Sequence, residues 1–230
     1  MVLKKYIKLV LLNRFFARIL LPPMLKLHTF FYMWSGFYSS ILNNGVHPKH
    51  RIMKYKEWFV DNIQCNDVVL DVGCNTGMMP KVMSEKAKFV YGIEIENKHI
   101  EEALNLRKKD NIEYICADAT TYNYSDCMPV DVVTLSNVLE HIENRVEFLQ
   151  KLTNKIKWND VKTFLIRVPM IDREWITLYK KELGIEYRLD RTHFIEYTFD
   201  SFKNELTQSG INIASYHIKF GEIYAVCKVI

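Results

Sequence analysis

The chain has 230 residues, of which 49% are hydrophobic and 25% are charged. This length and balance exclude a disordered chain and describe one globular domain with additional segments. An odd number of cysteines without any C-x-x-C pair argues against a disulfide framework and a zinc site, and favours reduced thiols in the cytoplasm. The cysteines are Cys65, Cys74, Cys116, Cys127 and Cys227.

The net charge of +4 conceals an uneven distribution. Residues 1–56 contain ten basic residues and no Asp or Glu, whereas the other 174 residues contain 21 basic and 27 acidic ones. We therefore expect two parts of different chemistry. They are a basic, aromatic-rich helical extension over residues 1–55 and an enzyme-like domain over residues 56–230.

Residues 2–21 mix apolar and basic side chains, and the longest uninterrupted apolar run is only Leu9–Leu12. A membrane-spanning helix needs about 20 mostly apolar residues, so this segment is not expected to span. The basic residues that interrupt it are also unlike those of a signal peptide. The pattern predicts an amphipathic helix that ends at Pro22-Pro23.

Two interpretations of this extension remain open. Residues 1–23 could lie on an anionic membrane surface, or the helix could dock on the protein's own core or in a homodimer. The aromatic-dense residues 24–42 could cover the active site or form a hydrophobic interface. Basic and aromatic residues together can also bind single-stranded nucleic acid, but no RNA-binding motif accompanies them, so we do not expect that partner.

After an expected helix over residues 50–62, short apolar strands alternate with helical segments. The expected strands are 68–72, 88–94, 112–116, 131–136 and 162–168, and the expected helices are about 78–87, 97–109 and 144–156. Such alternation predicts an α/β fold with a parallel sheet and right-handed crossovers. A helix over 199–209 and strands 211–219 and 223–229 follow. We expect a Rossmann-like, mostly parallel seven-stranded sheet with an antiparallel terminal hairpin strand.

A glycine-containing turn, Asp71 to Gly77, follows the first buried strand. Gly73 and Gly77 let a ligand approach the main chain closely. The dinucleotide fingerprint G-x-G-x-x-G seats a pyrophosphate, whereas the D-x-G-x-x-x-G pattern here places an acid that would repel one. This acid suits a cationic ligand, such as the amino group of an amino acid. Glu94 lies 21 residues after Gly73, where an acid commonly binds ribose hydroxyls.

Two further strand ends complete the pattern: Asp118-Ala119 after the third strand, and Ser136 followed by Asn137-Val138-Leu139-Glu140-His141 after the fourth. In this order, the segments resemble the motifs of class I S-adenosylmethionine (SAM) methyltransferases over about residues 60–230. The resemblance implies SAM as cofactor and S-adenosylhomocysteine as product. It also implies that Asp118 and Ala119 bind the adenine. The expected cofactor-binding residues are Asp71, Gly73, Cys74, Gly77, Glu94, Ile95, Asp118, Ala119 and Ser136.

The connection over residues 169–198 is rich in Arg, His, Tyr and Trp, which indicates a lid over the acceptor. Within it, the run Asp190–Thr198 resembles the D-x-x-H-x-x-x-Y-T segment of O-methyltransferases that act on sugars, quinones and other small hydroxylated acceptors. An alcohol must lose its proton, and histidine is the usual base. We expect His141 and His193 to be catalytic. The expected acceptor contacts are Glu140, Arg167, Arg191 and Tyr197.

A metal site is a weaker alternative. Quinone-pathway O-methyltransferases and small-RNA 2′-O-methyltransferases carry E-x-x-E-H and bind a divalent ion. Here Asn137 replaces the first glutamate, which removes a charged ligand. We therefore expect no metal, with Glu140, His141 and His193 as an incomplete alternative ligand set.

The function expected from the sequence is SAM-dependent O-methylation of a hydroxyl on a sugar or a lipid-linked glycan, in the cytoplasm or at the inner membrane face. One alternative is a quinone-type or other small-molecule O- or N-methyltransferase. Another is a SAM-binding module that contacts membranes or proteins without turnover.

Overall fold

The computed structural model describes residues 13–230, so part of the predicted N-terminal helix lies outside the described residues. The chain forms two compact units. One consists of the residues up to Met53 together with Ile176–Tyr187, and we call it the N-terminal unit. The other, the sheet domain, consists of Lys54–Trp175 and Arg188–Ile230.

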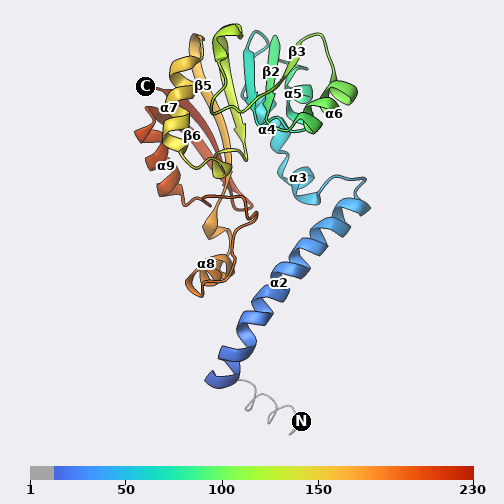
Figure 1. Ribbon diagram of the computed structural model, residues 1–230, viewed down its shortest axis with the longest axis vertical. Coiled ribbons are helices and arrows are strands. Elements are labelled where there is room, and N and C mark those ends of the chain that lie inside the picture. The colour runs from blue at the N-terminus through green and yellow to red at the C-terminus, as the bar shows by residue number, and fades with distance from the viewer. Residues whose placement is uncertain (1–12) are drawn as a thin grey trace. The chain divides into compact units, whose positions relative to one another are not determined.

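The sheet domain contains a seven-stranded sheet in the order β3-β2-β1-β4-β5-β7-β6 (Figure 1). The strands are β1 Val68–Val72, β2 Phe89–Glu94, β3 Ile112–Cys116, β4 Val130–Ser136, β5 Trp158–Pro169, β6 Ile211–Lys219 and β7 Glu222–Val229. Strands β1 to β5 pair in parallel, and β7 runs antiparallel to both β5 and β6. The predicted mixed Rossmann-like sheet is confirmed.

Helices cover both faces of this sheet (Figure 1). They are α4 Tyr55–Asp61, α5 Met78–Met83, α6 Asn97–Arg107, α7 Arg145–Lys155 and α9 Phe199–Gln208, with 3₁₀ turns η1 Tyr124–Asp126, η2 Leu139–His141 and η3 Ile171–Arg173. Because side chains alternate along a strand, Leu70 of β1 packs with α7 and α9 residues, while Val69 packs with Phe59 of α4 and Met83 of α5. Both faces of β1 are therefore buried, which explains its continuous apolar run.

The single helix expected over residues 50–62 is wrong. Two short helices, α3 Pro48–Met53 and α4, are separated by Lys54, whose φ of +54° lies in the left-handed region. A residue in this conformation cannot continue a right-handed helix. The apolar pattern did not reveal the break because lysine carries no turn signal.

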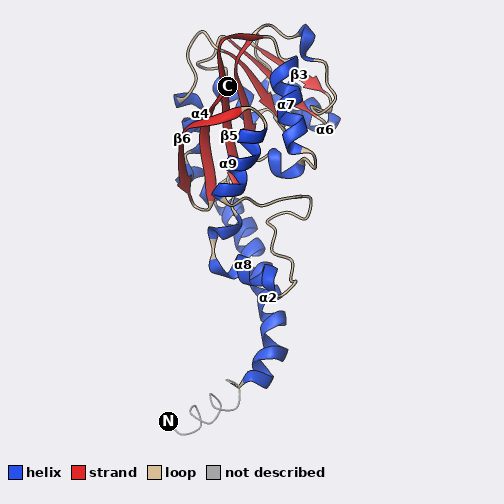
Figure 2. Cartoon of the chain, turned by 90° about the vertical axis from the view of Figure 1, so that its left-hand side faces the viewer, coloured by secondary structure: helices blue, strands red, loops and turns tan. Residues whose placement is uncertain are grey.

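The N-terminal unit is built on α2, a 29-residue helix over Arg14–Leu42. Its first turn is capped by Asn13, whose side-chain oxygen accepts a hydrogen bond from Phe16 N at 3.0 Å. Helix α8, Trp175–Glu182, packs beside α2, because Lys180 Nζ donates to Thr29 Oγ1 at 2.7 Å (Figure 2). Among the described residues, no helix combines the length and the apolarity needed to cross a membrane.

The expected helix end at Pro22-Pro23 is also wrong, since both prolines lie inside α2. Two prolines remove two backbone donors, which in a helix interior costs about 3 kcal/mol each. The helix nevertheless continues to Leu42, and two residues of the turns after the prolines make tertiary contacts. Leu25 is buried, and Thr29 accepts the hydrogen bond from α8.

Candidate active site

The glycine turn after β1 is anchored on the neighbouring strand. Gly73 N and Cys74 N both donate to Ile93 O of β2, at 2.8 and 3.0 Å. Gly73 and Gly77 have φ values of +71° and +80°. A Cβ on Gly73 would lie 2.6 Å from Val138 Cγ2, and one on Gly77 would lie 2.6 Å from the Tyr114 hydroxyl oxygen. Only glycine fits this turn at both positions.

Two carboxylates flank this turn. Asp71 is buried, its Oδ1 accepts from Thr134 Oγ1 at 2.5 Å, and its Oδ2 is buried with no hydrogen-bond partner. Burial, aided by the charge of Glu94, raises the pKa of Asp71 to about 7. The Glu94 carboxylate accepts from Asn75 N and Glu96 N, both at 3.0 Å. A cationic ligand group beside Asp71 would satisfy the free oxygen and favour its charged form, which fits the ammonium group of SAM.

The other predicted cofactor residues lie at the same edge of the sheet. Ile95 follows β2 and is 62% exposed, while Ser136 ends β4 in register with Arg167 of β5. Asp118 Oδ1 accepts from Thr120 N and Thr120 Oγ1, and Ala119 O accepts from Tyr124 OH. Ile95 therefore offers an exposed apolar surface of the kind an adenine ring packs on.

Cys74 differs from these residues because its side chain points into the protein. The thiol is buried, and burial raises its pKa far above the ordinary value. A thiol in such surroundings is neither a good nucleophile nor a good metal ligand. The contribution of Cys74 to the turn is therefore made by its backbone.

A second group of residues gathers beyond the carboxyl end of β4. The rings of His141 and His193 meet edge to face, with centroids 4.6 Å apart. Glu140 is buried between polar neighbours, yet neither of its carboxylate oxygens has a hydrogen-bond partner. Burial raises the pKa of Glu140 to about 7. The segment that carries His193 is tied to η2 by a hydrogen bond from Phe194 N to Glu140 O at 2.8 Å.

The hydrogen bonds of Thr192 define which nitrogen of His141 carries a proton. Thr192 Oγ1 lies 2.8 Å from Asp190 Oδ1 and 2.9 Å from His141 Nδ1. A hydroxyl has one proton, and the carboxylate can only accept it, so the Nδ1 of His141 must donate. The Nε2 atom is then left with its lone pair. Burial lowers the pKa of His141, which favours this neutral form.

The same cluster meets the geometric requirement of a metal site in part. One ligand atom each from Glu140, His141 and His193 lies within 4.8 Å of the others. Asn137, in the position of a fourth ligand, instead accepts a hydrogen bond from Arg167 Nε at 3.2 Å. The three residues could hold a divalent ion, which when bound would polarise an acceptor hydroxyl. The nearby guanidinium opposes a second positive charge.

Arg167 sits in a buried cluster that the sequence analysis missed. Its Nε lies 3.2 Å from Glu222 Oε2, and its guanidinium carbon lies 4.4 Å from the centre of the Tyr55 ring. Tyr224 OH donates to the same Glu222 oxygen at 3.3 Å. Arg167 Nη1 is buried without a hydrogen-bond partner. One nitrogen of this otherwise fixed guanidinium is thus available to an acceptor or to the cofactor carboxylate.

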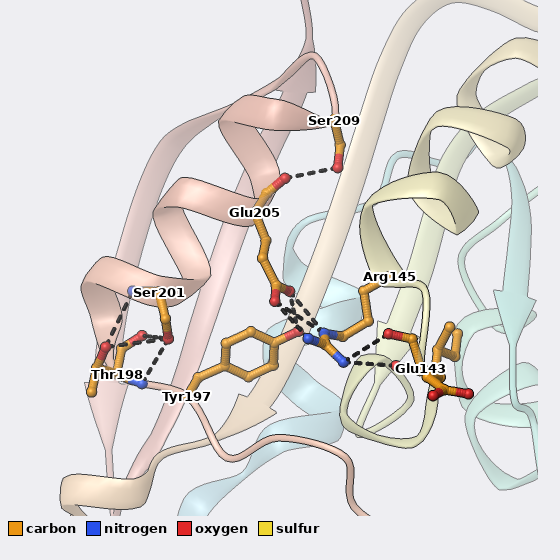
Figure 3. Close-up of polar contacts among 8 residues, drawn as sticks. Glu143, Arg145, Tyr197, Thr198, Ser201, Glu205 and Ser209 are labelled. Atoms are coloured by element: carbon orange, nitrogen blue, oxygen red, sulfur yellow. Dashed lines mark hydrogen bonds and ion pairs between the residues drawn. The ribbon is translucent and has the colours of Figure 1, made fainter.

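The remaining predicted acceptor contacts are not brought to this cluster. Arg191 is exposed. Tyr197 is fully buried, and its hydroxyl donates to Glu205 Oε2 at 2.8 Å, while Arg145 holds the same carboxylate through two nitrogens (Figure 3). The expected lid over residues 169–198 is also divided, because residues 176–187 belong to the N-terminal unit.

We predict that Tyr197→Phe lowers the free energy of unfolding by about 2 kcal/mol, because it removes one hydrogen bond to a charged carboxylate. The acceptor KM should stay unchanged. Urea denaturation and steady-state kinetics measure the two quantities. Tyr216→Phe, at an exposed tyrosine of β6, is the matched control and should change neither. A raised KM without loss of stability would instead show that Tyr197 contacts the acceptor.

Comparisons with known proteins agree with this architecture. Residues 70–159 match the family described as a methyltransferase domain. A ubiquinone biosynthesis O-methyltransferase from Rickettsia bellii is 29% identical over 115 residues, which cover 47% of this chain and 48% of that protein. The matched segments span less than half of the length of the curated relatives.

Two solved structures show the same fold. A SAM-dependent methyltransferase from Clostridium acetobutylicum superposes with a TM-score of 0.60 at 14% identity, covering 86% of this chain and 98% of that one. Magnesium protoporphyrin IX methyltransferase from Synechocystis, with bound S-adenosylhomocysteine, gives 0.59 at 17% identity, covering 79% and 83%. Residues 70–159 of the sheet domain therefore match a methyltransferase domain, and the sheet order and the glycine turn agree with the fold of class I, SAM-dependent methyltransferases.

Proposed function

We propose that this chain transfers the methyl group of SAM to a hydroxyl group on a sugar or a lipid-linked glycan. The proposal rests on the proximity of the glycine turn to the cluster that contains Glu140 and His141. Val138 packs against Gly73 of the cofactor turn, and the next residues along the chain include Glu140 and His141 of the polar cluster. A proton acceptor therefore stands beside the place where the cofactor is expected.

The reaction requires alignment and loss of a proton. SAM, when bound, supplies a methyl group that the acceptor oxygen takes as the carbon–sulfur bond breaks and its electron pair stays on sulfur. Holding the acceptor in line with that carbon accounts for much of the rate. His141 Nε2 takes the hydroxyl proton, while Nδ1 stays bonded to Thr192, whose hydroxyl is bonded to Asp190. His193 lies against the same ring and borders the acceptor.

The acceptor class is supported by the polarity of the cluster. Asp190 and Thr192 lie in a segment that resembles those of O-methyltransferases for sugars and quinones, and their side chains are exposed. Groups of this kind satisfy the many hydroxyls of a carbohydrate, which a purely apolar pocket would leave unpaired. Arg167 Nη1 adds a buried donor at the end of β5.

A second candidate is a quinone-type O-methyltransferase in which a divalent ion assists. The close approach of Glu140, His141 and His193 favours it, as does the likeness to a ubiquinone biosynthesis O-methyltransferase. This candidate predicts that chelation with EDTA abolishes activity and that adding back one divalent metal restores it. The histidine-base proposal predicts that EDTA has no effect.

The acceptor class is tested by methyl transfer from radiolabelled SAM into a lysate of the native organism, separated into lipid, glycan, nucleic-acid and small-molecule fractions. We expect label in the glycan or lipid fraction. Label confined to small molecules would move the assignment to the quinone-type candidate, and label in nucleic acid would contradict both. No label in any fraction, with SAM binding confirmed by calorimetry, would favour a binding module without turnover.

A further inference from the structure

We propose that α2 of the N-terminal unit is a surface for binding an anionic lipid membrane, with the helix lying in the plane of the interface and the exposed side chains of residues 14–42 as a contact. The inference goes beyond the methyl transfer proposed above and does not depend on which acceptor is used. It concerns where the protein works.

The first observation is the exposure of α2. Fourteen large apolar or aromatic side chains of this helix are exposed, and among its described residues only Leu25 is buried. They are Phe15, Ile19, Leu20, Met24, Leu27, Phe30, Phe31, Tyr32, Met33, Trp34, Phe37, Tyr38, Ile41 and Leu42. A contiguous exposed apolar surface of this extent marks a site of interaction.

The second observation is the arrangement of these residues around the helix. At 100° per residue, all of them except Tyr32 fall on about one half of the circumference, and Lys26, near its edge, is the only charged residue in that half. The opposite half carries Leu25 and Thr29, the side on which α8 packs. The helix therefore presents to its own unit the side that carries Leu25 and Thr29, and its broad apolar side remains exposed.

The third observation is the positive charge of the N-terminal unit, which favours an anionic lipid membrane as the binding partner of this surface. The N-terminal unit holds ten basic residues and only two acidic ones, Glu182 and Glu186, whereas the sheet domain holds 21 basic and 25 acidic residues. An anionic lipid surface attracts such a unit by about 1 kcal/mol for each basic residue near it. Lys26, at the edge of the apolar side, can extend its charged end toward phosphate groups while its stem covers apolar surface.

A second copy of this chain fits the surface less well. Two such units would bring together two strongly positive surfaces, which repel each other. A helix pair would also need a narrow apolar seam of the coiled-coil kind, whereas the apolar side of α2 is about half of its circumference wide, as in helices that lie in a membrane interface. Trp34 and Tyr38 belong to the residue types enriched at such interfaces.

The test uses the full-length protein, without SAM or acceptor, in flotation with vesicles of phosphatidylglycerol and phosphatidylcholine or of phosphatidylcholine alone. We expect binding to the anionic vesicles and much weaker binding to the neutral ones. The variant Phe30→Gln, Trp34→Gln, Phe37→Gln removes three exposed aromatic rings and should lower the partition coefficient at least about 100-fold. Since these side chains are exposed, circular dichroism should show an unchanged fold.

Two further variants make the result specific. Arg14→Gln, Arg18→Gln, Lys26→Gln removes three of the ten basic residues of the unit and should weaken, without abolishing, the preference for anionic vesicles. Leu104→Gln, Leu106→Gln, Ile218→Gln replaces three exposed apolar residues of the sheet domain and should bind as the unsubstituted protein does. Absence of vesicle binding would overturn the proposal, and so would a dimer in light scattering that the aromatic variant converts to a monomer. Because no methyl transfer is measured, failure here leaves the proposed reaction untouched.

Discussion

The substitution Gly73→Ala should weaken SAM binding strongly. The Cβ of the alanine would lie 2.6 Å from Val138 Cγ2, and the alanine would have to keep the glycine's φ of +71°. The side chain can be accommodated only if Val138 or the turn shifts, and this turn is the part of the backbone that we propose the cofactor approaches. We expect the dissociation constant for SAM, measured by isothermal titration calorimetry, to rise at least about 100-fold, which corresponds to about 2.7 kcal/mol.

The matched control is Gly210→Ala. Gly210 has a similar φ of +73°, but a Cβ there meets no atom within 4 Å. This variant should lose about 1 kcal/mol of unfolding free energy from the left-handed conformation alone and bind SAM normally. Adding Val138→Ala to Gly73→Ala removes the clashing methyl groups and should recover part of the affinity. Equal SAM affinities for the two single glycine variants would mean that the turn does not contact the cofactor.

The substitution His141→Ala should lower kcat by about 100-fold or more, the usual contribution of a general base, and leave SAM affinity unchanged. The reason is the loss of Nε2 as proton acceptor. His50→Ala in α3, a histidine of the N-terminal unit, is the matched control and should keep kcat. If kcat survives in His141→Ala and falls in His193→Ala, the base is His193 instead.

The pH dependence of kcat/KM tests the role of His141 independently. Burial and the adjacent His193 lower the pKa of His141 from its ordinary value of 6.5. The neutral base persists until the pH falls below that lowered pKa, so the acid limb of kcat/KM due to His141 should lie below pH 6.5. That limb should vanish in His141→Ala. Thr192→Val, which removes the hydroxyl that orients the ring, should lower kcat about tenfold without altering SAM binding.

The sheet and the placement of residues at its carboxyl edge could be predicted because their signals are local. Strand β1 is a continuous apolar run, and Asp71, Gly73 and Gly77 follow it directly, so one short segment contains both the strand and the turn. Parallel strands then bring Glu94 and Asp118 to the same edge without any further information. The approach of His141 to His193 depended on a resemblance, since 52 residues separate them.

The rest could not be read from the sequence because it depends on contacts between distant segments. The ion pair between Arg167 and Glu222 exists because β7 returns antiparallel to β5 and places Glu222 opposite Pro169. Tyr55 joins that cluster from a helix more than 100 residues earlier. Likewise, the prolines at 22 and 23 signal a helix end, whereas in the structure α2 continues past both of them.

The N-terminal unit is assembled from two pieces of chain that more than 120 residues separate, since α8 comes from an insertion after β5. Residues 1–53 alone therefore cannot be transferred to another protein by gene fusion with the unit intact. Grafted alone onto a related methyltransferase, α2 would lose the hydrogen bond that Thr29 accepts from Lys180. Grafting the insertion alone would leave Lys180 without that hydroxyl. We expect a chimaera to reproduce the unit only when both pieces are exchanged together.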